Sequence, residues 1–377
     1  MDRAQEIALL EELIGLNENG LFFLDDAVQF SLTDRYVSED RFDREMSSVF
    51  RRSPLIAAHA SELPERGSYL TRQISGLPVL LTREKDGTVN AFLNVCRHRG
   101  ARLVAEDRGC KHAFSCPYHA WTWDSSGSLR GIPHEKQGFP DLDRSAYALK
   151  RLPVTERLGL IWIVADPRAQ SNFDTFLEPV KKDFAWLGMA GLGIAACDQK
   201  VLSANWKLLL EGGLEAYHFK VTHKETIGPH FLDSLSSYQM LGPHIRSVLP
   251  RATATARDPR GGDSWSIQDH ANVLYTVFPL NQFLAMQDHV AWISLNPLAA
   301  DRTEARIVTL APRETIDENR MDHWRRNHRI TLNTLSEDFA VNEAAQDGMA
   351  SGANEFLTFG RYEGALHRFN AEVERRL

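Results

Sequence analysis

Two short pairs of cysteine and histidine constrain this chain more than any other feature. Cys96-x-His98 is followed, after 17 residues, by Cys116-x-x-His119. Four cysteines in 377 residues are too few for a disulfide scaffold, so a cluster of them predicts a metal or redox site. The remaining cysteines fit neither pair. We expect Cys110, with the nearby His112, to be a bystander and Cys197 to be a small core residue.

Three interpretations of the two pairs compete. Two cysteines and two histidines can hold a structural zinc ion in a tetrahedron. The same set can hold a Rieske [2Fe–2S] cluster, with two cysteines on one iron and two histidines on the other. The four residues could also be unrelated members of a core. The alternation Cys, His, Cys, His favours the Rieske cluster, because each loop can then serve both irons.

Composition excludes several classes of function. The formal net charge of −7 gives no electrostatic footprint for nucleic acid or an anionic membrane. The longest apolar run, Leu158 to Ala165, is too short to span a bilayer, and the acidic N-terminus does not resemble a signal peptide. We therefore expect a cytoplasmic protein. Glycine-rich nucleotide motifs are absent, so we expect the chain to bind no NAD or flavin itself. A Rieske cluster in it would therefore receive its electrons from a separate NAD(P)H-dependent reductase, directly or through a ferredoxin.

The pattern along the chain predicts an α+β protein in three parts. Residues 1–50 are expected to be mostly helical and to pack on a catalytic domain. Residues 51–166 contain short β-rich runs separated by turn signals and should form a small all-β domain. Residues 167–377 should form a larger α+β domain, with long helices on an antiparallel sheet. Helices are expected over 173–187, 206–223 and 316–349, and strands over 273–297 and 305–311.

A second candidate metal site lies in the larger domain, in the stretch NWKLLLEGGLEAYHFKVTH. On a continuous helix, Glu215 and His218 would share a face, and His223 would join them only if the helix bends or carries a π-bulge. Two histidines and a carboxylate form the ligand set of a non-heme Fe(II) site. The plainer alternative is a pair of helix histidines satisfied by local acceptors. The carboxylate candidates are Glu337, Asp338, Glu343 and Asp347, and sequence physics does not choose among them.

The motifs CRHRG and CPYHAWTW, together with the NWK…YH…H stretch, resemble the oxygenase (alpha) component of the Rieske non-heme iron oxygenases. The resemblance implies the ligands of two metal cofactors. Cys96, His98, Cys116 and His119 would bind the [2Fe–2S] cluster, and His218, His223 and Asp338 would bind the mononuclear iron. Asp338 is assigned because residues 337–351 match the family pattern E-D-x4-E-x2-Q-x-G-x2-S. The chain has Ala120 and Gly212 where the family usually has Gly and Asn.

Glu215 occupies the position of a family Asp that bridges a cluster histidine of one subunit and an iron histidine of the next. By position these would be His119 and His218, which implies a head-to-tail homotrimer. The carnitine and glycine betaine oxygenases resemble this chain in having Glu there. The resemblance therefore implies an enzyme that uses O2 to hydroxylate a small molecule, with a quaternary amine favoured and with demethylation or C–N cleavage as an outcome.

Two other functions remain open at this point. One is a ring-hydroxylating dioxygenase that acts on an aromatic acid, and the other is a non-enzymatic Rieske electron carrier with a ligand-binding domain. A quaternary amine would need an aromatic pocket, and an aromatic acid would also need an arginine, for which Arg246 and Arg251 are candidates. Six residues are candidates for lining the pocket, with ordinary core packing as the equal alternative for each: Phe231, Tyr275, Phe278, Phe283, Met286 and Trp292.

Overall fold

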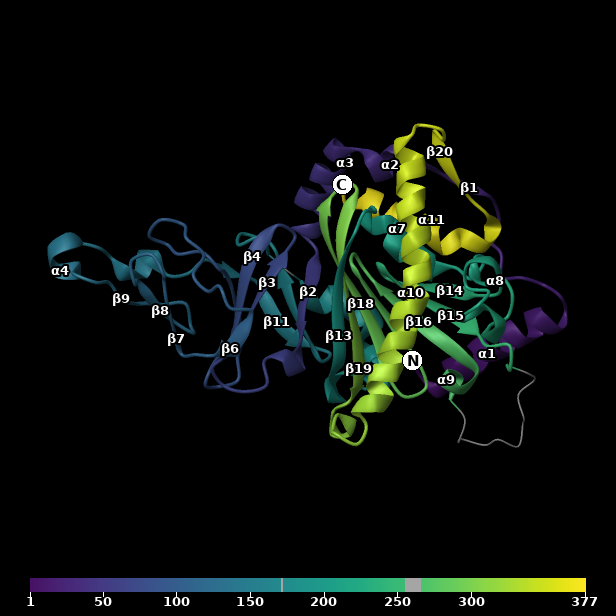
Figure 1. Ribbon diagram of the computed structural model, residues 1–377, viewed down its shortest axis with the longest axis horizontal. Coiled ribbons are helices and arrows are strands. Elements are labelled where there is room, and N and C mark those ends of the chain that lie inside the picture. Colours follow the sequence, from purple (N-terminus) through teal and green to yellow (C-terminus); the bar gives the residue numbers. More distant parts are fainter. Residues whose placement is uncertain (171, 255–265) are drawn as a thin grey trace. The chain divides into compact units, whose positions relative to one another are not determined.

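The computed structural model describes residues 1–170, 172–254 and 266–377. The chain divides into two compact units, one formed by residues 50–173 and the other by residues 1–49 together with 174–377 (Figure 1). Each unit has buried apolar side chains of its own. Within the described residues, none of the helices combines the length and the apolar character that crossing a membrane would require.

The smaller unit is built from three antiparallel sheets. The largest has the strand order β10-β5-β4-β3-β6, and two three-stranded sheets have the orders β11-β12-β2 and β7-β8-β9. The strands are β2 (Pro54–His59), β3 (Ser68–Ile74), β4 (Leu77–Arg83), β5 (Val89–Leu93), β6 (Arg108–Cys110), β7 (Ala113–Ser115), β8 (Thr122–Asp124), β9 (Leu129–Gly131), β10 (Arg151–Leu152), β11 (Val154–Arg157) and β12 (Leu160–Val164). One short helix, α4 (Glu135–Gly138), follows β9.

An aromatic core supports two loops of this unit. Trp121, Trp123 and Phe114 are buried together beneath the cysteine–histidine pairs. The first pair lies in the loop between β5 and β6, and the second lies in the hairpin between β7 and β8. In that hairpin the backbone N–H of Cys116 donates to the carbonyl of Trp121 at 2.8 Å. The sheets therefore bring two hairpin-like tips together over one core.

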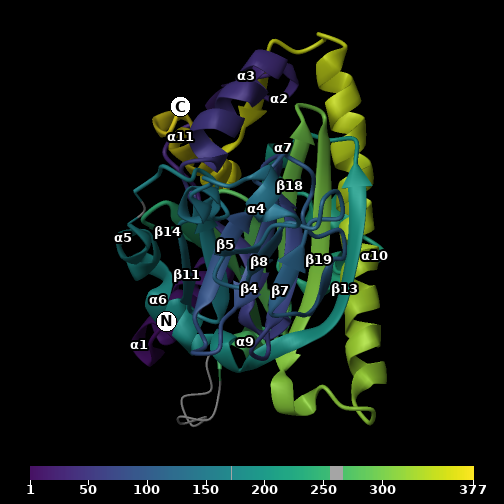
Figure 2. The same cartoon turned by 90° about the vertical axis from the view of Figure 1, so that its left-hand side faces the viewer.

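The larger unit is organised around a seven-stranded antiparallel sheet with the order β13-β19-β18-β17-β16-β15-β14. Its strands are β13 (Leu192–Leu202), β14 (Ser237–Leu241), β15 (His244–Pro250), β16 (Ala271–Val277), β17 (Asn281–Ala285), β18 (Val290–Ala299) and β19 (Arg302–Pro312). The 30-residue helix α10 (Met321–Ala350) runs along β13 and β19, as Figures 1 and 2 show from two directions.

Shorter elements complete the larger unit. They are α1 (Arg3–Glu18), α2 (Asp34–Val37), α3 (Glu39–Arg44), a π-helical segment (Glu45–Phe50), α5 (Phe173–Leu177), α6 (Lys181–Trp186), α7 (Trp206–Glu211), α8 (Phe219–Thr222), α9 (Ile267–His270), α11 (Gly364–Arg375) and the paired strands β1 (Gln29–Leu32) and β20 (Phe356–Phe359). A buried ion pair anchors α7, because Lys207 Nζ lies 2.8 Å from Glu45 Oε1.

The α+β class is confirmed, as are the expected strands from Val273 onward and the long C-terminal helix. Two expectations of local structure are wrong. Cys197 is exposed rather than a core residue, because it lies on β13, which pairs with only one neighbouring strand at the edge of the sheet. The helix expected over residues 206–223 is broken, since α7 ends at Glu211 and α8 begins only at Phe219. Strands β13, β14 and β15 were not predicted, because their sequences lack a clear alternation of apolar and polar residues.

Candidate metal centres

The two cysteines of the smaller unit are buried in the loops that carry them. Neither Cys96 nor Cys116 forms a disulfide, and each is 3% exposed. Burial raises the pKa of the Cys96 thiol; backbone N–H groups of His98 and Arg99 oppose the rise, and Cys116 adds to it. N–H groups directed at sulfur are suited to a thiolate ligand, because they stabilise its negative charge.

The histidines of these loops each direct a ring nitrogen inward without a partner. The Nδ1 atoms of His98 and His119 are buried, and neither atom forms a hydrogen bond. The two rings lie 4.9 Å apart, and His98 stacks on Trp121 at 4.7 Å with an interplanar angle of 5°. A buried polar atom without a partner is unfavourable unless a ligand satisfies it. Two thiols and two free imidazole nitrogens therefore fit a bound metal group of the kind predicted.

The outer side of His119 faces a cation. Its Nε2 lies 3.0 Å from a guanidinium nitrogen of Arg99. The central guanidinium carbon of Arg99 lies 4.3 Å from the centre of the exposed Tyr118 ring. Cys110 does not join the loops' donor set, because it is exposed and its sulfur contacts the carbonyl oxygen of Arg66 at 3.6 Å.

In the larger unit, the broken helix positions the second candidate site. Gly212 and Gly213 follow α7 as a 3-10 turn, and Glu215 has an extended backbone with φ −143° and ψ 164°. The expectation that Glu215 and His218 share a helical face is therefore wrong. Paired glycines and the strand-like backbone at Glu215 interrupt the helix, since glycine favours helical conformations poorly. His218 then precedes α8 and His223 follows it, so the short helix holds both side chains on one side.

A loop that folds back tightly fixes His223. The backbone N–H groups of Thr226 and Gly228 both donate to its carbonyl, at 3.1 and 2.8 Å. A Cβ at position 228 would lie 2.6 Å from the carbonyl oxygen of Phe219, so only glycine fits there. His223 is 1% exposed, which leaves its ring little freedom.

Three side chains converge on one point at this site. His218 Nε2 and His223 Nε2 lie 3.3 Å apart. Asp338 Oδ1, from the middle of α10, lies 3.0 Å from His223 Nε2 and 3.5 Å from His218 Nε2. Among the described residues, these three form the one group of three or more such side chains whose donor atoms all lie within 4.8 Å of one another, as a single metal ion requires. Two imidazoles and one carboxylate on one side of an ion match a facial triad with open positions.

Carboxylates hold the opposite nitrogen of each imidazole. His218 Nδ1 is in short contact with Glu215 Oε1, and His223 Nδ1 lies 2.6 Å from Glu337 Oε2. Such partners fix the tautomer, so that Nε2 carries the free lone pair. The other two candidates lie elsewhere: Glu343 accepts the backbone N–H of Ser203 at 2.9 Å, and Asp347 is more than two turns further along α10.

The charges of this site are strongly coupled. Burial alone would lower the pKa of His218, but hydrogen bonds to Asp338 and Glu215 outweigh it and raise the pKa to about 10. Burial would raise the pKa of Asp338, yet hydrogen bonds to the two histidines lower it. A metal ion would compete with protons for the same lone pairs, so its binding would release protons from this site.

The candidate substrate residues separate into two groups. Tyr275, Phe278, Phe283 and Trp292 belong to the core, where Phe283 stacks on Trp292 at 5.6 Å. Met286 is half-buried. Arg246 is 2% exposed, and its charge is matched by Asp183 at 2.7 Å. These core residues and Arg246 are closed to a substrate, so their prediction as pocket residues is wrong. Phe231 and Arg251 instead line a hollow of about 360 Å³.

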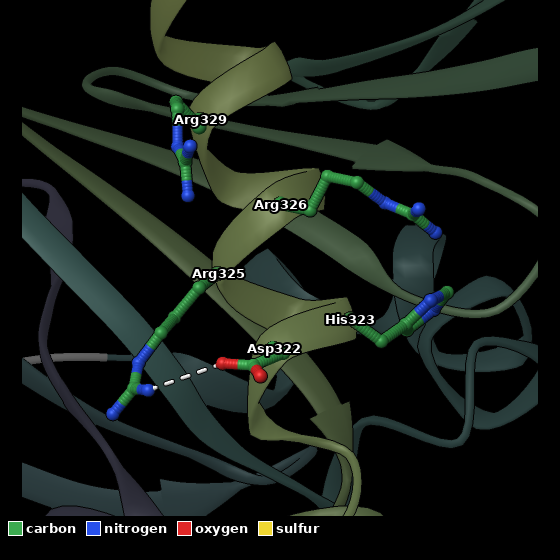
Figure 3. A pocket seen from close by; sticks show the side chains of 5 residues that line it. All are labelled: Asp322, His323, Arg325, Arg326 and Arg329. Carbon is green, nitrogen blue, oxygen red and sulfur yellow. Dashed lines mark hydrogen bonds and ion pairs between the residues drawn. The ribbon is translucent and has the colours of Figure 1, made fainter.

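A second hollow, of about 390 Å³, lies on the outer face of α10 (Figure 3). One helix supplies all of its lining: Asp322, His323, Arg325, Arg326 and Arg329. Arg329 is the lining residue nearest to Asp338 in the sequence, and it lies nine positions earlier, which is roughly 13 Å along the helix axis. The arginines spread outward in the close-up, and only Arg325 reaches Asp322, at 3.4 Å. This hollow is therefore separate from the candidate iron site.

The parts played by Glu337 and Gly228 were not predicted from the sequence. Glu337 was a candidate ligand, but its carboxylate contacts Nδ1 of His223 and the hydroxyl of Thr226, both at 2.6 Å. The available signal in the sequence was the pair of adjacent acidic residues, Glu337 and Asp338, on one predicted helix. The turn at Gly228 could have been suspected from the Gly228-Pro229 pair, which marks a change of chain direction.

Comparison with known proteins matches two parts of the chain to family models. Residues 53–153 match the model of the Rieske [2Fe-2S] domain, and residues 187–377 match that of the ring hydroxylating alpha subunit (catalytic domain). The chain is 36% identical to the chlorobenzene dioxygenase subunit alpha of Cupriavidus sp. (strain PS12) over 50% of its own length and 42% of that protein. It is 35% identical to the glycine betaine monooxygenase oxygenase subunit of Chromohalobacter salexigens, over 60% and 48% of the two chains. The chain thus matches about half the length of these curated relatives.

Solved structures share the fold over nearly the whole chain. The quaternary ammonium Rieske monooxygenase CntA in complex with L-carnitine superposes with a TM-score of 0.78 at 22% identity, covering 93% of this chain and 96% of that one. Naphthalene 1,2-dioxygenase from Rhodococcus sp. gives 0.76 at 20% identity, covering 99% and 98%. The protein belongs to the ring-hydroxylating alpha subunits, the Rieske non-heme iron oxygenases whose cofactors are a [2Fe–2S] cluster and a mononuclear iron.

Proposed function

We propose that this chain is a terminal oxygenase that hydroxylates a small organic molecule with O2. Electrons would come from a separate NAD(P)H-dependent reductase, directly or through a ferredoxin. The convergence of His218, His223 and Asp338, in a chain that also carries a Rieske domain, supports this function most strongly. A non-enzymatic electron carrier would have no use for a facial triad.

The proposal assigns separate tasks to the parts of the chain. Residues 51–166 would hold the cluster through Cys96, His98, Cys116 and His119, and residues 167–377 would hold the iron, with residues 1–50 packed on that domain. When bound, the cluster supplies electrons singly and the iron supplies open positions for O2 beside the substrate. All four cysteines are free, which suits work in the reducing cytoplasm.

The chain's own residues would orient both groups. Glu215 and Glu337 hold the Nδ1 atoms of the two histidines, so that both Nε2 atoms face Asp338. We further propose that Glu215 also accepts a hydrogen bond from Nε2 of His119 in a neighbouring copy, within a head-to-tail homotrimer. A carboxylate can serve two imidazole N–H groups at once, because it has two acceptor oxygens.

A quaternary amine is the favoured class of substrate. Glu215 at the bridging position, shared with the carnitine and glycine betaine oxygenases, and the similarity to a glycine betaine monooxygenase subunit both support it. Mono-oxygenation of such a molecule would lead to demethylation or C–N cleavage. Dioxygenation of an aromatic acid is the second candidate, supported by relatives that include the large subunit of anthranilate 1,2-dioxygenase.

Iron content tests the ligand assignment directly. Wild-type protein should hold about three Fe per chain, two in the cluster and one at the triad. His218→Ala and Asp338→Ala should each lower the content to about two, keep the visible spectrum of the cluster and abolish product formation. Glu343→Ala, on the same helix, should keep all three. An Asp338→Ala protein with its third iron intact would show that another carboxylate is the ligand.

A further inference from the structure

The hollow lined by Phe231 and Arg251 begins where the loop after His223 ends. Its walls combine apolar side chains, among them Ile227 and Phe231, with polar groups from His230, Arg251, Thr253 and Asn272. Among the described residues that line it, none is an aspartate or a glutamate. The described lining therefore offers hydrogen-bond donors and an apolar wall, and it contributes no carboxylate.

Apolar packing connects this hollow to the candidate iron site. The ring of Phe219 lies 5.5 Å from the ring of His223 on one side and 5.5 Å from Phe231 on the other. Phe219 also belongs to a small cluster with Ala216, Leu249 and Leu274, against which Ile227 and Phe231 pack. A single aromatic ring thus separates the wall of the hollow from a predicted iron ligand.

Arg251 carries a charge that no carboxylate of the described chain neutralises. One of its terminal nitrogens donates to Asn272 Oδ1 at 3.0 Å, and its Nε is buried without a partner. Arg246, on the preceding strand β15, differs in this respect because Asp183 pairs with it. A guanidinium is always charged and presents a planar fork of donors, which matches a carboxylate with two parallel hydrogen bonds.

We propose that Arg251 binds a carboxylate of the substrate in this hollow, while the remainder of the substrate lies against Phe231, on the side nearest to Phe219 and the iron ligand His223. This inference rests on the proposed oxygenase function and narrows its substrate to carboxylate-bearing molecules. Betaines and aromatic acids both meet that requirement, and unsubstituted aromatic hydrocarbons do not. Arg251 would act as a specificity-determining residue that fixes one end of the substrate.

Two matched pairs of probes test the proposal by equilibrium binding. Glycine betaine and choline share a trimethylammonium group, and only the first has a carboxylate; anthranilate and aniline form the corresponding aromatic pair. Calorimetry on full-length protein, with and without iron, should show a preference for the carboxylate in one pair of roughly 10- to 100-fold in Kd. The pair that shows this preference identifies the class of substrate.

Variants locate the preference on the residue. Arg251→Gln keeps a donor for Asn272 but removes the charge, and it should abolish the preference. Arg251→Lys should restore part of it, because the charge returns without the fork. The matched control is Arg325→Gln, an exposed arginine in the separate hollow on α10, which should change nothing. Melting temperature, cluster spectrum and iron content confirm that each variant is folded.

Two outcomes overturn the proposal. One is a wild-type protein without a carboxylate preference in either pair, as expected if the chain itself neutralised Arg251. The other is a preference that survives Arg251→Gln. Calorimetry requires no turnover, so carboxylate binding by a protein that shows no O2-dependent product would contradict the oxygenase function while leaving this binding site intact.

Discussion

At the scale of single residues, Ala120 lies in an unfavourable backbone conformation. Its φ is +56°, in the left-handed region where the family usually has glycine. Replacement by glycine removes the clash of Cβ with the backbone, although it also increases the entropy of the unfolded chain. We expect Ala120→Gly to stabilise the protein by about 0.5–1 kcal/mol in urea unfolding followed by tryptophan fluorescence.

The control for this change is Ala148→Gly in the same unit. Ala148 has an ordinary φ of −57°, so glycine there should only destabilise the protein. Equal losses of stability in both variants would mean that the left-handed conformation at Ala120 carries no strain.

Glu215 provides the second residue-scale prediction. Its Oε1 contacts His218 Nδ1, and its Oε2 accepts the backbone N–H of His218 at 3.2 Å. Glu215→Gln leaves one acceptor oxygen for these donors and for the proposed bridge. We expect both metal centres to remain, while electron transfer between them, measured by rapid mixing of reduced cluster with substrate and O2, slows by roughly 10- to 100-fold.

Glu337→Gln is the matched control, because Glu337 holds the other histidine but has no proposed bridging role. If Glu215 merely orients its histidine, both variants should lower iron affinity alike and leave the electron-transfer rate per bound iron unchanged. A selective loss of rate in Glu215→Gln supports the bridge.

At the scale of elements, α7 is held by a carboxyl group in a buried network. Tyr36 and Asn370 each donate to Glu211 Oε1 at 2.7 Å. Burial raises the pKa of Glu211, although these hydrogen bonds and Lys207 oppose the rise. A carboxyl with a raised pKa in the folded state binds more protons folded than unfolded. Its contribution to stability is therefore complete below the unfolded pKa of about 4.5 and is lost as pH rises toward the folded pKa.

Glu211→Gln should remove this pH dependence, because its amide oxygen accepts the same two hydrogen bonds and does not ionise. In urea unfolding from pH 4.5 to pH 8, the variant should gain on wild type by at most about 1.4 kcal/mol per pH unit, until the folded pKa is passed. Parallel pH profiles for the two proteins would mean that Glu211 is ionised in the fold.

At the scale of the whole molecule, the proposed trimer predicts complementation between two inactive chains. Cys116→Ser should abolish the cluster and its visible absorption, and His218→Ala should abolish the mononuclear iron. If electrons pass between neighbouring subunits, mixed trimers should regain activity. In a random equal mixture, about a quarter of the contacts join an intact cluster to an intact iron site.

Tagged subunits and tandem purification would verify that the trimers are mixed before O2 uptake is measured. Each chain alone should stay inactive. Confirmed mixed trimers without activity would indicate that electrons stay within one chain, which contradicts the bridge through Glu215.

Local spacing carried most of the information that the sequence offered. The two cysteine–histidine pairs predicted the Rieske domain because ligands on a short loop are fixed by covalent spacing. Periodicity predicted the strands after Val273 and the long α10 in the same way. The break between α7 and α8 escaped prediction, because the local pattern of apolar residues continues across Gly212 and Gly213 while the backbone does not.

Long-range contacts decided the remainder. The choice among four acidic residues on α10 depends on which of them faces two histidines more than a hundred positions earlier, and only packing of α10 against β13 and β19 sets that orientation. The same holds for the arginines. The sequence by itself made Arg246 and Arg251 equal candidates, but the fold buries Asp183 beside the first and leaves the second facing a hollow, because a charge is neutralised by neighbours in space and not by neighbours in sequence.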